Sequence, residues 1–308
     1  MPTHPLSVWL GFTMLVLGLL ALDLGVLNRR SHRLSMTEAS LWSGSIVALA
    51  LVFGGYLWWR EGSTAALEYY SGYLIELSLS VDNLFVFILI FQYFAVPAAL
   101  QPRVLKWGIL GAIIMRGIMI VLGALLLQRF HWIIYIFGGI LIVTGIRLFK
   151  GQAEHIEPEK NPVIRLARRL MPVTPAYEGQ SFMVKTPNGR WFATPLLLVV
   201  LFVEWSDLVF AIDSIPAIFA VTRDPFIVYS SNVFAILGLR ALYFVLAGAM
   251  DKFVHLKVGV AAILIFVGIK MVISSWIHIP TTVSLGVILL FLSVATWASI
   301  RGEERLPT

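Results

Sequence analysis

Long apolar segments recur from one end of this chain to the other, and they constrain its fold more than any other feature. Hydrophobic residues make up 59% of the 308 residues and charged residues only 13%, a balance far from that of soluble domains. A helix needs about 20 mostly apolar residues to cross a bilayer. We therefore expect a single all-α polytopic membrane domain over residues 1–308, with about nine transmembrane helices. The segments are 6–27, 41–59, 67–94, 103–128, 131–149, 195–220, 227–250, 256–276 and 280–300.

Basic residues predict how these segments are oriented. Most Lys and Arg fall in alternate connecting segments, while the other set holds only Arg60, Arg129 and Arg223. Since basic residues collect in cytoplasmic loops, we expect the N terminus outside and the C terminus in the cytoplasm of an inner-membrane protein. The net charge of +6 is then a topology signal, and no nucleic-acid partner is expected.

One long polar segment, 150–194, interrupts the apolar pattern. Its five prolines argue against a single long helix. Within it, SFMVK (181–185) and RWFAT (190–194) flank a TPNG segment, whose Asn188-Gly189 pair favours a tight turn. We expect a cytoplasmic loop that contains a small hairpin.

Two parts of the chain resemble each other. The fifth segment contains ILIVTGIR (140–147) and the eighth contains ILIFVGIK (263–270), and the fourth and seventh place Arg116 and Arg240 in mid-helix at nearly the same offset. The third and sixth segments both carry acids. Because each unit has three spans, an odd number, its second copy enters the membrane in the opposite orientation, so spans 3–5 and 6–8 predict an inverted repeat. In transporters this architecture places the substrate site at the repeat interface near the midplane.

Five acidic residues lie deep in the third and sixth segments. Each costs roughly 2.5 to 3.5 kcal/mol at a helix centre, which packing alone does not explain. They are Glu76, Asp82, Glu204, Asp207 and Asp213.

Three structural interpretations compete with a ligand-binding one. The acids could pair with Arg116 and Arg240, which would then be charge-compensating, but even with Arg147 and Lys270 four cations face five carboxylates. They could be protonated, which would suit a proton relay, or they could line a hydrated crevice. Asp23, a sixth acid, is expected to pair with an arginine.

Helical geometry restricts how these acids can meet. Residues six apart, as in Glu76 and Asp82 or Asp207 and Asp213, point about 240° apart on a straight helix. Pro216 removes one helical hydrogen bond and predicts a helix kink. We therefore expect unwound or kinked helices at residues 82–83 and 213–216, where Asn83 and Ser214 would add oxygen ligands.

The available ligands indicate a hard cation. Carboxylate, amide and hydroxyl oxygens suit Mn²⁺, Mg²⁺ and Ca²⁺, and their residue types do not separate the three ions. The chain has no cysteine, and its six histidines fall in tails, loops or span edges. No zinc-protease spacing or Ser-His pairing lies inside the spans, so neither an enzyme nor a tightly bound cofactor is expected.

At these motifs the chain resembles the TerC family of integral membrane proteins, in the LysE-like transporter superfamily. The resemblance covers nearly the whole chain. It implies manganese(II) export, with Glu76, Asp82, Glu204, Asp207 and Asp213 as functional residues; the family name records tellurium resistance. The matching segments are GYLIELSLSVDN (72–83), VPAALQ (96–101), VEWSD (203–207), FAIDSIPAIFAV (210–221) and SNVFAILGLR (231–240).

Two functions remain in competition. The first is an exporter in which the acids, Asn83 and Ser214 bind a metal exposed alternately to each side, with proton exchange as a plausible coupling. The second is a non-transporting scaffold that acts in metal delivery to secreted proteins beside the secretion machinery, or in envelope stress. The cation, protons and membrane lipids are the expected partners.

Overall fold

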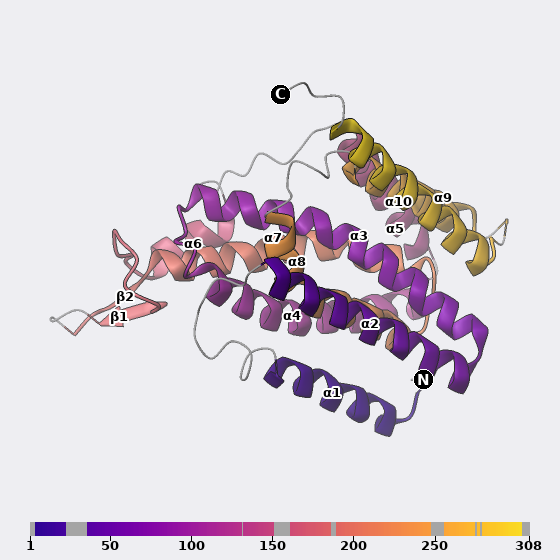
Figure 1. Cartoon of the computed structure of the whole chain (residues 1–308), viewed down its shortest axis with the longest axis horizontal. Coiled ribbons are helices and arrows are strands. Elements are labelled where there is room, and N and C mark those ends of the chain that lie inside the picture. Colours follow the sequence, from indigo (N-terminus) through magenta and orange to yellow (C-terminus); the bar gives the residue numbers. More distant parts are fainter. Residues whose placement is uncertain are drawn as a thin grey trace.

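Helices follow the apolar segments in a computed structural model, which describes residues 4–22, 36–130, 132–150, 161–185, 189–247, 256–274, 276–277 and 279–303. Figure 1 shows most of them running along the long axis of the molecule. The helices are α1 (Leu6–Ala21), α2 (Met36–Glu61), α3 (Ser63–Tyr93), α4 (Gln101–Arg129), α5 (Ile133–Phe149), α6 (Pro162–Leu170), α7 (Pro195–Phe219), α8 (Pro225–Ala247), α9 (Leu256–Ile273) and α10 (Thr281–Glu303).

The protein is an all-α membrane protein apart from one small hairpin. Within the described residues, four helices are long and apolar enough to cross a bilayer, at Thr37–Glu61, Gln101–Arg129, Pro195–Phe219 and Thr281–Ser299. Shorter apolar helices lie at Leu6–Ala21, Ile133–Phe149, Pro225–Leu239 and Val258–Ile273. The count of nine spans stays a prediction.

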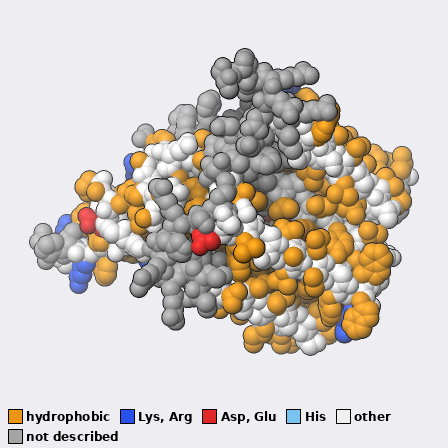
Figure 2. Space-filling view, viewed as in Figure 1, with side chains coloured by type: hydrophobic (Ala, Val, Ile, Leu, Met, Phe, Trp, Pro, Cys, Tyr) orange, Lys and Arg blue, Asp and Glu red, His pale blue; other side chains and the backbone are white. Residues whose placement is uncertain are grey.

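The helical surface is rich in apolar side chains, as Figure 2 shows over much of the visible face. Met14 of α1 is 70% exposed, Ile114 of α4 66% and Leu290 of α10 59%. An exposed apolar surface of this extent is suited to lipid rather than to water.

The centre of the molecule is a bundle of four helices. α3 and α4 each pack against both α7 and α8, so α3 and α4 lie on opposite sides of the bundle. α2 covers α3 and α8, and α1 lies at the edge of the molecule in Figure 1. We call the space enclosed by these four helices the bundle centre.

A second packing unit, α5 against α9, lies beside the bundle, and α10 joins it by packing on α9 and α3. Its two helices approach closely at glycines. A Cβ added at Gly138 would lie 2.9 Å from the Gly268 carbonyl oxygen, and one added at Gly268 would lie 2.7 Å from the Gly138 oxygen. Small residues of this kind let helix backbones meet in membranes.

The segment that the sequence predicts as a cytoplasmic loop contains α6 and two short strands. Asn161 caps α6 by accepting hydrogen bonds from the backbone N–H groups of Val163 and Ile164 at 2.9 and 3.3 Å. Strands β1 (Met183–Lys185) and β2 (Trp191–Ala193) pair antiparallel, with Val184 opposite Phe192. Figure 1 shows this hairpin projecting beyond one end of the helices.

Tyr177 ties this segment to the bundle. Its hydroxyl donates a hydrogen bond of 2.8 Å to the carbonyl oxygen of Phe94, next to the end of α3. Burial raises the pKa of Tyr177 to about 12, so the hydroxyl stays protonated at neutral pH and keeps this bond.

The expected unwinding of two helices is wrong. α3 is helical throughout Ser63–Tyr93, including residues 82–83, and α7 is helical throughout Pro195–Phe219, including residues 213–216. Pro216 cannot donate to the carbonyl oxygen of Ile212, so α7 lacks one hydrogen bond in its last turn, yet the backbone stays helical to Phe219. A kink without unwinding, at residues 82–83 or 213–216, stays a prediction.

Candidate functional site

Arg116 of α4 lies at the bundle centre and is 1% exposed. Its Nη2 donates to Asp207 Oδ1 at 2.7 Å and its Nε to Asp207 Oδ2 at 3.1 Å, a two-pronged contact with α7. Its Nη1 donates to Glu76 Oε1 of α3 and reaches Ser214 Oγ of α7 at 3.5 Å. One guanidinium therefore joins three of the four central helices.

The charges around Arg116 do not balance. Glu76 is fully buried and Asp207 is 3% exposed, so two carboxylates share one buried cation. The second carboxylate oxygen of Glu76, Oε2, is buried without a hydrogen-bond partner among the described residues. With both acids ionised the group carries one excess negative charge, which favours either a proton or an added cation.

Glu204 faces α4 one turn before Asp207 on the same side of α7. A Cβ at Gly111 of α4 would collide with its carboxylate, so this glycine leaves the space that the carboxylate occupies. Glu204 thus lies at the α4–α7 contact, on the side of α7 that carries Asp207.

Asp213 lies at a different contact. Thr144 of α5 donates a hydrogen bond of 3.0 Å to Asp213 Oδ1, which directs this acid to the α5–α7 interface. Because α7 is continuous, the six-residue separation of Asp207 and Asp213 turns the two carboxylates to different sides of the helix.

Asp82 and Arg240 are described only in their backbones, within α3 and α8, and Asp23 lies outside the described residues. Asn83 is 2% exposed, and its Oδ1 is buried without a hydrogen-bond partner. The structure therefore brings Glu76, Asp207 and Ser214 together around Arg116, and directs Glu204 and Asp213 to neighbouring contacts.

The part of the chain that the structure describes holds no group of three acidic or histidine side chains close enough to ligate one metal ion. Next to Asp207 there is a cavity of about 10 Å³, close to the volume one water needs. It is lined by Phe87, Leu105, Gly108, Ile109, Ala112, Asp207 and Leu239. In the described arrangement Arg116 lies between Glu76 and Asp207.

Three residues of this region were missed in the sequence. Thr144 was part of the repeated motif but not considered as a donor, Gly111 was one glycine among many, and Asn232 lay unremarked in the segment that ends at Arg240. A polar or very small residue in mid-membrane is the signal that could have identified them.

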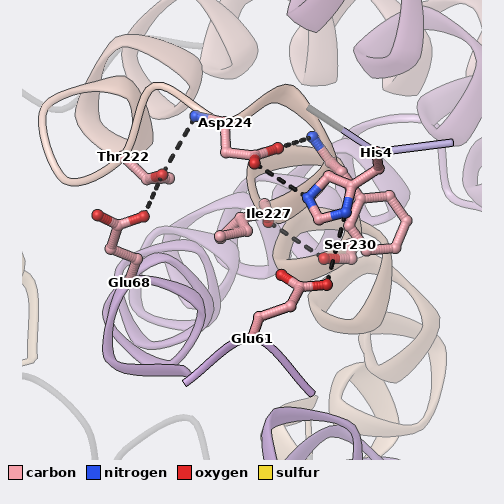
Figure 3. A network of polar contacts seen from close by, with 8 residues as sticks. His4, Glu61, Glu68, Thr222, Asp224, Ile227 and Ser230 are labelled. Carbon is pink, nitrogen blue, oxygen red and sulfur yellow. Dashed lines mark hydrogen bonds and ion pairs between the residues drawn. The ribbon is translucent and has the colours of Figure 1, made fainter. Parts of the chain in front are cut away.

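A second polar group lies at the opposite end of the bundle from the hairpin (Figures 1 and 3). The ring of His4 contacts Asp224 Oδ2 through Nε2 at 3.0 Å and Glu61 Oε1 through Nδ1 at 3.5 Å. Thr222 donates to Glu68 Oε2 at 2.6 Å. This group fastens the residues before α1 to the end of α2 and the α7–α8 turn, and the other five histidines lie in parts whose side chains the structure does not describe.

Comparison with known proteins identifies relatives over nearly the whole chain. The sequence model of the integral membrane protein TerC family matches residues 61–305. An uncharacterised membrane protein of Myxococcus xanthus is 52% identical over 98% of this chain and 94% of its own. Alx of Escherichia coli K12, provisionally named a membrane-bound redox modulator, is 46% identical over 97% of both chains. No solved structure matches.

Proposed function

This chain belongs to the TerC family of integral membrane proteins, and on that premise we propose that it exports a hard divalent cation, manganese(II), across the inner membrane. The observation that carries the proposal is the charge at the bundle centre. Within the part of the chain that the structure describes, two buried carboxylates, Glu76 and Asp207, share the guanidinium of Arg116, and Glu76 Oε2 has no hydrogen-bond partner. Oxygen ligands with a surplus of negative charge suit Mn²⁺, Mg²⁺ and Ca²⁺ alike, and the choice of manganese follows the family resemblance.

In this proposal Arg116 is the counter-ion of the empty site. A cation that enters the bundle centre competes with the guanidinium for Glu76 and Asp207, and Arg116 returns when the cation leaves. Since a buried carboxylate without any counter-ion is strongly destabilising, this exchange leaves the two acids with at least one positive partner at every stage. Proton exchange on the acids is the proposed coupling.

The remaining acids would extend the path away from Arg116. Glu204 lies on the α4 side of α7, and Asp213 lies on the α5 side. Asp82 and Asn83 come about two turns after Glu76 on α3. We propose that a cation passes between these oxygens as the two halves of the protein move.

We further propose that the fold has nine spans, with α3–α5 and α7–α9 as the inverted repeat. The α5–α9 contact supports the repeat. At the offset that aligns the two motifs, Gly145 corresponds to Gly268 and Gly138 to Ala261. The contact of Gly138 with Gly268 therefore predicts an equivalent contact of Ala261 with Gly145, and a Cβ at Gly145 would lie 2.9 Å from the Ala261 oxygen.

Helix neighbours support the same relation. In the proposed repeat α3, α4 and α5 correspond to α7, α8 and α9. The contact of α3 with α8 then corresponds to the contact of α7 with α4, and α3–α7, α4–α8 and α5–α9 are contacts between corresponding helices. A contact between corresponding elements is what a twofold relation produces. The basic residues of the loops support an N terminus outside and a C terminus in the cytoplasm.

The provisional name of Alx refers to redox modulation, and this chain has no cysteine. A thiol–disulfide role is therefore closed to it. The competing function is a scaffold for metal delivery to secreted proteins, which would use the hairpin segment and tolerate neutral substitutions at the bundle centre.

The test is cellular manganese in an exporter-deficient strain that expresses the wild type, Asp207→Asn or Glu178→Gln. Glu178 is an exposed acid beyond the end of the bundle, so its loss is the matched control. We expect lower manganese with the wild type and Glu178→Gln, and no lowering with Asp207→Asn at equal membrane expression. Equal manganese in every strain would reject manganese export and favour the scaffold.

A further inference from the structure

Asn232 of α8 is fully buried, and neither polar atom of its carboxamide has a hydrogen-bond partner among the side chains and backbone that the structure describes. Buried amides in native proteins are almost always bonded, because an unbonded one loses its hydration without compensation. Neighbouring Ser231 is equally buried, and its hydroxyl bonds the carbonyl oxygen of Val228 on its own helix at 3.1 Å. Asn232 therefore needs an explanation that its neighbour does not.

The contacts of α8 fix the direction of Asn232. Ser231 packs against Gly72 of α3, and Tyr229 packs against Gly117 of α4. Successive residues of a helix point about 100° apart, so the side chain of Asn232 points between the direction of α3 and the direction of α4. It therefore enters the space between these two helices. That space is the bundle centre.

Leu239 gives an independent check of this direction. It follows Asn232 by seven residues, which brings it back to within about 20° of the same side of the helix. Leu239 lines the cavity beside Asp207. The side of α8 that carries Asn232 therefore faces the carboxylates at the bundle centre.

The height of Asn232 along the bundle also matches. Tyr229, one turn before it, meets α4 at Gly117, the residue next to Arg116. Of the four helices, α3, α4 and α7 contribute Glu76, Arg116 and Asp207 to the centre. α8 contributes Asn232 at that level.

We propose that Asn232 is a ligand of the transported cation, supplying its amide oxygen from the fourth helix when Arg116 has withdrawn from the acids. The inference rests on the proposed function and adds a neutral oxygen to a charged site. Such an oxygen binds Mn²⁺, Mg²⁺ or Ca²⁺ without adding to the negative charge that must be compensated in the empty state.

The experiment uses the full-length protein in detergent and measures its thermal unfolding over a manganese(II) titration. The variants are Asn232→Leu, Asn232→Asp and, as the matched control, Ser231→Ala. Leucine has a similar volume and removes an unbonded buried amide, so we expect the metal-free Tm of Asn232→Leu to equal or exceed that of the wild type. A merely structural asparagine would instead lower it.

With manganese, we expect the half-saturating concentration to rise at least tenfold in Asn232→Leu and to stay within threefold of the wild type in Asn232→Asp and Ser231→Ala. Asn232→Ala replaces the leucine variant if the latter does not assemble. A wild-type-like titration of Asn232→Leu or Asn232→Ala overturns this inference alone. A wild type that responds to none of manganese, magnesium and calcium overturns the proposed function, and this inference with it.

Discussion

The bundle centre and the α5–α9 contact lie side by side but are built from opposite materials. The bundle centre encloses Arg116, Glu76, Asp207 and Asn232, while α5 and α9 meet through glycines and aliphatic side chains. The α5–α9 contact is not suited to binding a ligand, and the bundle centre is not suited to close backbone packing. Close backbone contact leaves no space for a ligand, and a polar centre with unpartnered atoms contributes little to stability without one.

This difference assigns a structural role to the α5–α9 contact and a binding role to the bundle centre. The α5–α9 contact is fixed by backbone atoms of both helices, so it is suited to stay rigid. The bundle centre is held by side chains that can exchange partners. Variants that separate stability from cation binding can therefore break or sharpen the comparison.

The largest effect is expected from Arg116→Met. It leaves Glu76 and Asp207 buried without a counter-ion, and breaking such a buried group costs about 3–5 kcal/mol of unfolding free energy. Thermal unfolding in detergent measures the loss. Arg129→Met, at the exposed end of the same helix, is the control and should change little. Adding Glu76→Gln to Arg116→Met should restore part of the stability; no restoration would mean that charge is not the cause.

Gly268→Ala should follow, with a loss of about 1–3 kcal/mol from overpacking. Its new methyl group would lie 2.7 Å from the backbone oxygen of Gly138, which cannot move without shifting α5. Gly139→Ala is the control, because a Cβ there meets nothing within 4 Å. We expect the half-saturating manganese concentration of Gly268→Ala to remain within twofold of the wild type. A larger change would mean that the α5–α9 contact and cation binding at the bundle centre depend on each other.

Thr144→Val should lower stability by about 1 kcal/mol, the usual net contribution of one hydrogen bond. It removes the hydroxyl that donates to Asp213 Oδ1 at 3.0 Å while keeping the side-chain shape. Thr13→Val is the control, since the Thr13 hydroxyl bonds the carbonyl oxygen of Trp9 in its own helix. Manganese uptake into inverted membrane vesicles should fall in Thr144→Val, and an unchanged rate would separate Asp213 from the transport path.

The smallest change in stability is expected for Gly111→Ala. The new methyl group displaces only the end of the flexible Glu204 side chain, and the gain of about 1 kcal/mol in helix propensity offsets the displacement. Manganese affinity should nevertheless fall, because the carboxylate leaves the α4–α7 contact. Gly117→Ala is the control, because a Cβ at Gly117 would lie 3.4 Å from the ring of Tyr229, an ordinary van der Waals contact. Equal affinities in the two variants would remove Glu204 from the site.

The sequence predicted the helices well because apolar runs report directly on burial in lipid or protein. It also singled out Arg116 as an intramembrane partner of acids. It could not predict which acids Arg116 contacts, because the direction of a side chain depends on how α3, α4 and α7 rotate against each other. The unwinding expected at residues 213–216 was wrong because it assumed that Asp207 and Asp213 share one ligand shell, whereas α7 stays helical and turns them toward different neighbours.

The reciprocal glycines of α5 and α9 have a further consequence for the origin of such a protein. In this contact each helix offers the other the same kind of surface, so the two halves need not differ for the surfaces to fit. Under the inverted repeat that we propose, two separate copies of one ancestral three-helix chain, inserted in opposite orientations, would assemble through this contact before their genes were joined. The same proposal makes Ala261 a divergence of one half from Gly138 of the other.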